Sequence, residues 1–364
     1  MKSVVVHPDT SILGGGEIVC ALVIRALSNL GYETQLATET LGGGVVKDLV
    51  HDSTGRTLDL LSMRQRSLPF LATYLRLLSA RVNLASLRST EADLIISTQA
   101  LLPMPHLREG QRHVLYVHYP AMRTLEATQD SLLRNAYLTP ARMYLEGHLR
   151  GVDIMLCNSL FTKQAILRYW GEFSPPDPHV VYPSSLRHFD PSAGFQNRGR
   201  RCVYVGRLTP FKRHEVMKEL AASLRDTDFV SAGSATLSHD SYVRRLLRNR
   251  PQNYSVVSNA TVEQIRLLFE QSRLYIHCAR EEHFGIALVE AMKGGCVPLV
   301  HASGGPAEIV PTELRWNSYE DLTQKCLSFL SDEGHWNLWH KRIIELSRSY
   351  SPERFEEEFS KAVF

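Results

Sequence analysis

The sequence alternates short β-branched runs with longer helical stretches, and this alternation constrains the fold more than any other feature. Strands that are separated by helices pair in parallel within one sheet, and the helices cover its faces. The pattern therefore predicts an α/β fold of doubly wound parallel sheets. The strands predicted in the first half are Ser3–His7, Glu33–Ala37, Leu94–Ser97, His113–His118, Ile154–Asn158 and His179–Tyr182.

A polar, proline-containing segment from Tyr182 to about residue 200 separates this series from a second one and is predicted to be a linker. The chain of 364 residues is also longer than one hydrophobic core usually serves. We therefore expect two Rossmann-like domains, residues 1–190 and 191–345, with a C-terminal helix over about 346–364 that joins the first. The strands predicted for the second domain are Arg201–Val205, Asp228–Ser231, Tyr254–Val257, Leu274–His277 and Val297–Val300.

Charge, hydropathy and cysteine content argue against several classes of protein. Lys and Arg number 41 against 38 Asp and Glu, a net charge of +3, so nucleic-acid binding is not expected. No apolar run reaches the roughly 18 residues that cross a bilayer, and the first residues do not resemble a secretory signal. The cysteines form no Cys-x-x-Cys pair, which favours reduced thiols in a cytoplasmic protein and argues against a zinc site. They are Cys20, Cys157, Cys202, Cys278, Cys296 and Cys326.

Two glutamates flank the start of a helix that is predicted to follow the strand Leu274–His277. Glu282 precedes this helix, which should begin near Phe284 or Gly285, and Glu290 lies in its early turns. The unpaired amides at such a helix start attract an anion such as a diphosphate. Because carboxylates repel phosphate, the glutamates are better suited to sugar hydroxyls, Glu282 to a hexose and Glu290 to a ribose. The spacing is equally compatible with a capped surface helix that carries two solvated glutamates.

A second candidate segment, Gly206-Arg207-Leu208-Thr209-Pro210-Phe211-Lys212, directly follows the first strand of the second domain. Arg207 and Lys212 should lie at the carboxyl edge of the sheet, where doubly wound sheets bind their ligands. Two fixed cations there could neutralise a diphosphate and stabilise it as it leaves. The alternative is a basic surface turn without a ligand.

The first domain offers a glycine loop and a histidine. Gly14–Gly16 lie between a predicted strand and the predicted helix Glu17–Leu30, where the missing Cβ atoms permit close backbone approach. The loop does not match G-x-G-x-x-G, so dinucleotide binding is disfavoured, and a plain tight turn is the alternative. His118 ends a predicted strand and could reach a ligand, although a single histidine is also often structural.

Taken in order along the chain, these segments resemble the retaining glycosyltransferases of family 4. That family has the GT-B fold, in which two Rossmann-like domains face a central cleft. The resemblance covers nearly the whole chain. It includes the glycine loop, G-R-L-x-P-x-K at 206–212, E-x7-E at 282–290 and Ser303-Gly304-Gly305-Pro306-Ala307-Glu308. It implies an enzyme that transfers a hexose from a nucleotide sugar.

A narrower set of segments is similar to the eukaryotic α-1,2-mannosyltransferases that extend the dolichol-linked oligosaccharide from GDP-mannose. This chain is shorter than those enzymes and is expected to lack their N-terminal membrane anchor. The similarity implies mannose from GDP-mannose, and a glycan, a glycolipid or another hydroxyl compound as acceptor. The segments are His7-Pro8, Gly14-Gly15-Gly16-Glu17, Tyr116-Val117-His118-Tyr119-Pro120, Asn158-Ser159-Leu160-Phe161-Thr162 and His283-Phe284-Gly285-Ile286.

The resemblance also implies roles for individual residues. Two cations on the diphosphate and two side chains on the hexose are the expected catalytic residues: Arg207, Lys212, Glu282 and His118. Glycine backbone, the helix start and a carboxylate on the ribose would hold the rest of the donor: Gly15, Gly16, Gly206, Phe284, Gly285, Ile286 and Glu290. Because the two cations take the place of a divalent ion, no metal and no other cofactor is expected.

Residues 60–90 carry five arginines and no acidic residue, interleaved with apolar side chains. Such a basic amphipathic segment could attach the protein reversibly to an anionic membrane, at its cytoplasmic face. A core-packed helix with a solvated face is the alternative.

The expected reaction retains the α configuration by a same-face route. The departing diphosphate accepts the proton of the acceptor, and the protein supplies positioning and charge stabilisation. Three alternatives remain open. They are a UDP-sugar donor with glucose or N-acetylglucosamine, nucleotide-sugar epimerisation or phosphorolysis on the same fold, and a non-catalytic nucleotide-sugar or carbohydrate binder. A nicotinamide oxidoreductase is disfavoured by the incomplete glycine pattern.

Overall fold

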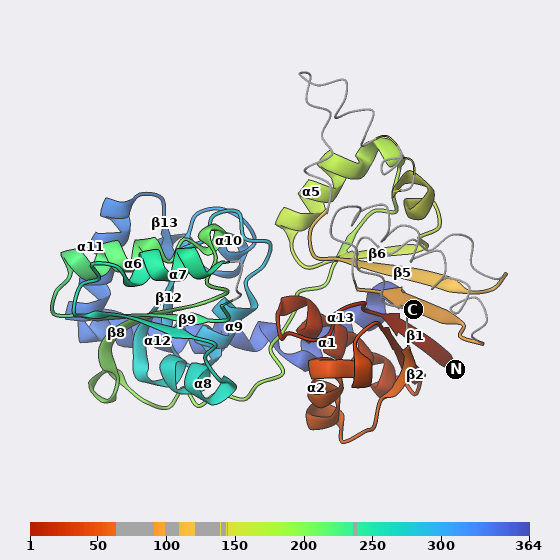
Figure 1. Cartoon of the computed structure of the whole chain (residues 1–364), viewed down its shortest axis with the longest axis horizontal. Coiled ribbons are helices and arrows are strands. Elements are labelled where there is room, and N and C mark those ends of the chain that lie inside the picture. The colour runs from red at the N-terminus through yellow and green to blue at the C-terminus, as the bar shows by residue number, and fades with distance from the viewer. Residues whose placement is uncertain (63–90, 99–108, 121–138, 140–142, 144, 236–238) are drawn as a thin grey trace. The chain divides into compact units, whose positions relative to one another are not determined.

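The computed structural model describes residues 1–62, 91–98, 109–120, 139, 143, 145–235 and 239–364 (Figure 1). The chain forms two compact units. The first contains Met1–Leu186 and Pro352–Phe364, and the second contains Arg187–Ser351. The corresponding boundaries predicted from the sequence are residue 190 and about residue 346.

Contacts within the second unit account for these differences. Arg187 forms an ion pair with Glu290, so the second unit begins a few residues earlier than predicted. Helix α12 (Glu333–Ser347) packs on α9 (Ile286–Lys293), so the chain stays with the second unit to Ser351.

The first unit contains a seven-stranded parallel sheet with the strand order β3-β2-β1-β4-β5-β6-β7. The chain winds from β1 to β3, returns across the sheet to β4 and continues to β7. The sheet is therefore doubly wound, and its direction switch lies between β1 and β4. The strands are β1 (Lys2–Val6), β2 (Glu33–Thr38), β3 (Asp59–Ser62), β4 (Leu94–Ser97), β5 (Arg112–Val117), β6 (Ile154–Cys157) and β7 (His179–Val180); β3 was not predicted.

Helices cover this sheet, and the last one brings the C-terminal residues into the first unit. α1 packs on α2 and on α13. Arg25 of α1 forms ion pairs with Glu353 and Glu356 of α13, at 2.9 and 3.1 Å. Ser159 caps α5 by accepting a hydrogen bond from the Thr162 amide. The helices are α1 (Gly15–Asn29), α2 (Gly44–Thr54), α5 (Leu160–Trp170) and α13 (Pro352–Val363).

The second unit contains a six-stranded parallel sheet with the order β10-β9-β8-β11-β12-β13 and a direction switch between β8 and β11. In Figure 1, α6 and α7 lie on one face of this sheet and α8 and α12 on the other. The strands are β8 (Gly199–Val205), β9 (Asp228–Gly233), β10 (Tyr254–Ser258), β11 (Ser272–His277), β12 (Val297–His301) and β13 (Arg315–Trp316). The remaining helices are α6 (Glu215–Ser223), α7 (Asp240–Leu247), α8 (Val262–Gln271), α10 (Pro306–Ile309) and α11 (Tyr319–Ser331).

A buried arginine fastens the segment that enters the second sheet. Arg198 is only 2% exposed, and Trp336 packs against it with the guanidinium carbon 5.8 Å from the ring centroid. An arginine carries five N–H donors, which is enough to satisfy several buried carbonyls at once. Arg198 donates at 2.7–3.4 Å to the carbonyls of Pro191, Ala193, Phe269, Ser272 and Gly294. Much of the predicted linker is therefore an integral part of the second unit.

We expect Arg198→Ala to lower the free energy of unfolding by about 3–5 kcal/mol, because several buried carbonyls lose their donor together. Urea denaturation followed by circular dichroism measures this change. Arg250→Ala is the matched control, since Arg250 is exposed, and its effect should stay within about 0.5 kcal/mol. An Arg198→Ala protein as stable as the parent would contradict the structural role of this side chain.

Candidate functional site

The predicted donor-binding residues meet at the direction switch of the second sheet. Doubly wound sheets bind ligands beyond the carboxyl ends of their strands at this place. β8 is followed directly by Gly206 and Arg207, and β11 ends at His277, ahead of the loop that carries Glu282. The two predicted donor-binding segments of this unit therefore leave neighbouring strands at one edge of one sheet.

Contacts between backbones hold these loops in place. A Cβ atom on Gly233, at the end of β9, would collide with the carbonyl of Gly206. A Cβ atom on Gly305 would collide with the carbonyl of His283, and the Gly305 amide donates to the Glu282 carbonyl at 2.8 Å. Glycine permits this approach because it has no side chain. The segment that precedes α10 thus positions the Glu282 loop.

Helix α9 begins at Ile286, next to the predicted start. Gly285 precedes it with φ of 94°, a left-handed conformation that favours glycine. No side chain caps this helix, so its first amides can bind an anion. Phe284 is buried and packs against Tyr350 with ring centroids 6.1 Å apart. The packing of Phe284 therefore anchors the start of α9, and the first amides of the helix have no side-chain cap.

Lys212 and Glu282 form an ion pair, and their side chains are only 15% and 12% exposed. Burial alone would raise the pKa of Glu282, but the charge and the hydrogen bond of Lys212 outweigh it and lower this pKa to about 2. Glu282 is therefore ionised at neutral pH. The two residues were predicted to contact different parts of the donor, whereas in the structure they contact each other.

Two histidines near this ion pair are neutral. Burial lowers the pKa of His277 and of His283 to about 4, and the charge of Lys212 acts in the same direction. A Cβ atom on Gly285 would lie 3.6 Å from Nε2 of His277, so this ring packs beneath the helix start. Arg207 is exposed, and its charge also lowers the pKa of His283. At neutral pH the positive charge therefore resides on Lys212 and Arg207 rather than on the two rings.

Glu290 is buried, with 3% of its surface exposed. Nη1 of Arg187 lies 3.2 Å from its Oε1 atom and 3.3 Å from its Oε2 atom. Both glutamates of the E-x7-E segment are thus mostly buried and paired with a cation. The alternative of a surface helix with two solvated glutamates is therefore wrong.

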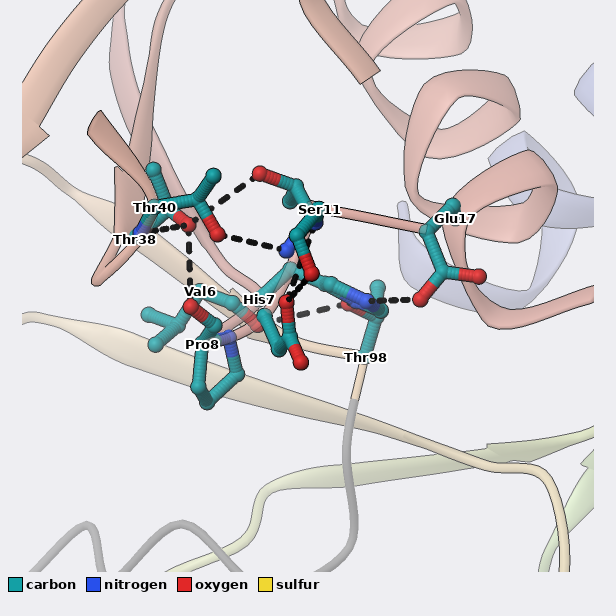
Figure 2. Close-up of polar contacts among 10 residues, drawn as sticks. Val6, His7, Pro8, Ser11, Glu17, Thr38, Thr40 and Thr98 are labelled. Atoms are coloured by element: carbon teal, nitrogen blue, oxygen red, sulfur yellow. Dashed lines mark hydrogen bonds and ion pairs between the residues drawn. The ribbon is translucent and has the colours of Figure 1, made fainter. Parts of the chain in front are cut away.

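The first unit has a polar cluster at its own direction switch, between β1 and β4 (Figure 2). His7 follows β1 and is buried, and its Nδ1 atom lies 2.7 Å from Oγ1 of Thr98, which follows β4. Its Nε2 atom lies 3.3 Å from Oε1 of Glu17, in the first turn of α1. These two contacts connect the end of β1 with the end of β4 and with the start of α1.

The predicted glycines and His118 adjoin this cluster. A Cβ atom on Gly16 would lie 3.3 Å from the His7 ring and 3.7 Å from Nε2 of His118. A Cβ atom on Gly14 would lie 2.9 Å from the Glu17 carboxylate, and Gly15 is exposed. The structure therefore brings the glycine loop, His7 and His118 together, although no contact between the loop and His118 was predicted.

Four side chains of these two clusters were not among the predicted site residues: His7, Glu17, Thr98 and Arg187. His7 and Thr98 each directly follow a strand beside the direction switch, so a correct strand order would have pointed to them. No sequence pattern pointed to Arg187, because its partner Glu290 lies 103 positions further along the chain.

The described part of the chain contains no cluster of three or more His, Cys, Asp or Glu side chains arranged to hold a metal ion. Within that part, no helix combines the length and the apolar content needed to cross a membrane. The six cysteines are free and buried. Of the segment 60–90, for which membrane contact was predicted, residues 63–90 lie outside the described residues.

Two family matches cover most of the chain. Residues 13–184 match Glycosyltransferase Family 4, and residues 188–345 match the glycosyl transferases of group 1. The chain belongs to these glycosyltransferases. The predicted family is therefore confirmed, and this glycosyltransferase is an enzyme, as expected.

The glycosyltransferase is similar to two groups of mannosyltransferases. It is 25% identical over 358 residues to the mouse GDP-Man:Man(3)GlcNAc(2)-PP-Dol alpha-1,2-mannosyltransferase, covering 82% of this chain and 72% of that protein. It is 26% identical over 378 residues to the alpha-1,3/1,6-mannosyltransferase ALG2 of Kluyveromyces lactis, covering 88% of this chain and 73% of that protein. The narrower resemblance found in the sequence is confirmed, and it extends to the second group.

Solved glycosyltransferase structures have the same fold. Anabaena HepE in complex with UDP and glucose gives a TM-score of 0.72 at 15% identity, with 99% of this chain and 98% of that chain covered. Sucrose-phosphate synthase of Thermosynechococcus elongatus gives a TM-score of 0.75 at 13% identity, with 99% and 97% covered. The predicted GT-B fold of two Rossmann-like domains is confirmed.

We expect Gly305→Ala to reduce glycosyl transfer at least about tenfold, because the added Cβ atom displaces the His283 carbonyl and with it Glu282. Release of nucleoside diphosphate from a nucleotide sugar measures the rate. Gly194→Ala is the control, since a Cβ atom there meets nothing within 4 Å, and it should retain the parental rate. A parental rate in Gly305→Ala would show that this backbone contact is dispensable.

Proposed function

We propose that this enzyme transfers mannose from GDP-mannose to a hydroxyl of a glycan or a lipid-linked acceptor, with retention of the α configuration. The observation that carries the proposal is the juxtaposition of Lys212, Glu282 and the uncapped start of α9 at one sheet edge. The names of the similar proteins support GDP-mannose as donor and a dolichol-linked glycan as the class of acceptor.

The diphosphate of the donor is proposed to bind between the start of α9 and the two cations. An ammonium group carries three protons, so Lys212 can donate to Glu282 and still donate to phosphate oxygens. Arg207 is exposed beside this place and adds a second positive charge. The backbone of Phe284, Gly285 and Ile286 supplies amides at the positive end of the helix dipole.

The two carboxylates are proposed to bind hydroxyl groups, Glu282 on the mannose and Glu290 on the ribose. A bare carboxylate would repel the nearby diphosphate. Lys212 and Arg187 balance these charges, because each lies in contact with one of the glutamates. A carboxylate that is already paired with a cation still accepts hydrogen bonds from sugar hydroxyls on its remaining lone pairs.

The transfer step is proposed to take place on one face of the sugar. The bond between the anomeric carbon and the diphosphate oxygen breaks, and the acceptor oxygen forms the new bond from the same side. The acceptor proton passes to the departing diphosphate oxygen, so that no protein base is needed. Lys212 and Arg207 stabilise the charge that develops on the diphosphate. His118, Gly15 and Gly16 of the first unit stay predicted contacts of the donor or acceptor.

The donor is tested with GDP-mannose, UDP-glucose and UDP-N-acetylglucosamine, scored by released nucleoside diphosphate and by analysis of the glycosylated product. We expect turnover with GDP-mannose and an α-linked product. Thermal stabilisation by GDP at 100 times its dissociation constant should reach about 2.7 kcal/mol, with a smaller effect of UDP at the same concentration. Turnover with a UDP-sugar alone would replace the proposed donor, and a free epimerised nucleotide sugar would replace the proposed reaction.

Lys212→Met is expected to lower kcat by about 100- to 1,000-fold, because the cation stabilises charge that develops only as the diphosphate leaves. Steady-state kinetics with GDP-mannose measure this loss. Lys341→Met removes an exposed lysine of α12 and should leave kcat unchanged. A Lys212→Met enzyme with near-parental kcat would remove this residue from the proposed mechanism.

Because Lys212 and Arg207 supply the positive charge, we propose that the transfer needs no divalent cation. Activity with GDP-mannose is then expected to persist in the presence of EDTA, measured after the enzyme has been passed through a chelating resin. Complete loss with EDTA, followed by recovery on addition of Mg²⁺ or Mn²⁺, would contradict this assignment.

The cytoplasmic location and the membrane contact of residues 60–90 stay predictions. The free, buried state of the six cysteines supports the former.

A further inference from the structure

Arg187, which was not a predicted site residue, forms an ion pair with Glu290, one of the two carboxylates of the predicted site. Arg187 is the first residue of the second unit, directly after the chain leaves the first. Its Nη1 atom lies 3.2 and 3.3 Å from the two carboxylate oxygens of Glu290. The side chains of Arg187 and Glu290 are 15% and 5% exposed.

The burial of this pair fixes its geometry. A carboxylate that is removed from water is stable only with a cation or several hydrogen-bond donors, and the loss of its partner leaves an unpaired buried charge. Glu290 belongs to α9, whose start is held by Gly285 and by the packing of Phe284. The backbone of Glu290 is therefore fixed by the helix, and Arg187 fixes the rotation of its carboxylate.

We propose that Arg187 is a positioning residue that aims the Glu290 carboxylate at the ribose hydroxyls of the nucleotide. The inference rests on the proposed function, because it takes a GDP moiety at the start of α9 as given. A carboxylate offers about four lone-pair sites, so the contact with Nη1 is compatible with accepting hydrogen bonds from both ribose hydroxyls. Arg187 itself contacts no part of the nucleotide in this assignment.

The assignment separates ribose recognition from the chemistry of transfer. Lys212, Arg207 and Glu282 act at the diphosphate and the hexose, and Arg187 acts through Glu290, which binds the ribose. Removal of Arg187 should therefore weaken donor binding while it leaves the bound donor reactive. It should also reduce the ability of the enzyme to distinguish a nucleotide with ribose hydroxyls from one without them.

The test compares GDP with 2′,3′-dideoxy-GDP by calorimetric titration of the full chain. We expect the parent enzyme to bind GDP at least about tenfold more tightly than the dideoxy compound, since hydrogen bonds to a charged group are lost. In Arg187→Ala this ratio should fall to within about threefold of unity, with a KM for GDP-mannose about tenfold higher and a kcat within about threefold of the parent. Arg187→Lys should restore part of the ratio, and Arg225→Ala, which removes an exposed arginine of the same unit, should keep the parental ratio.

A second comparison covers the case in which Arg187→Ala folds poorly. In the Glu290→Gln background there is no carboxylate for Arg187 to orient, so the further change Arg187→Met should not alter the ratio again. An Arg187→Ala enzyme that still discriminates like the parent overturns the inference and leaves the proposed function standing. A further fall of the ratio in the double variant would also overturn it. A parent enzyme that binds neither nucleotide overturns the proposed function, and the inference falls with it.

Discussion

Lys212 and Glu282 meet because the chain of the second unit reverses its direction across the sheet between β8 and β11. The two strands are neighbours in the sheet, although the side chains that follow them are 70 positions apart in sequence. Parallel pairing places both carboxyl ends at one edge, so the loops that leave them must share a small space. Glycines at 233 and 305 allow that crowding, because a Cβ atom on either one would collide with a neighbouring carbonyl.

The charges near the start of α9 are balanced in pairs. Four charged side chains lie on α9, on the loop before it or in contact with one of these. They form two ion pairs, Lys212 with Glu282 and Arg187 with Glu290, so each carboxylate has its own cation. This arrangement resolves the difficulty that two acids flank a proposed diphosphate site. His277 and His283 add no charge, since their pKa values are about 4. The electrostatic potential at the start of α9 is thus determined mainly by these two ion pairs and by Arg207.

Much of the fold could be predicted because buried parallel strands are short β-branched runs that end at loops. The run Leu94-Ile95-Ile96-Ser97 has no other plausible assignment, and it forms β4. β3 was missed because only four residues, Asp59–Ser62, form an edge strand with a polar start, and β13 consists of two residues. Their strand character comes from pairing with β2 and β12, which no local pattern encodes.

The candidate site was predictable to the extent that its residues follow strands. Arg207, Glu282 and His118 were predicted in this way. The partner of each carboxylate was not, because an ion pair between distant residues depends on strand order and on helix packing. His7 illustrates the same point, since its contact with Thr98 forms only when β1 and β4 are neighbours.

The two units also differ in whether the chain forms them from one stretch or from two. The second unit is a single uninterrupted stretch, Arg187–Ser351, and the arginines near its beginning are tied to its own interior. The first unit is discontinuous, since α13 must return to lie against α1. A gene fragment that encodes Arg187–Ser351 would produce the second unit with all of the contacts that form within it. The first unit could be produced in isolation only if its terminal helix were rejoined by a short artificial connection.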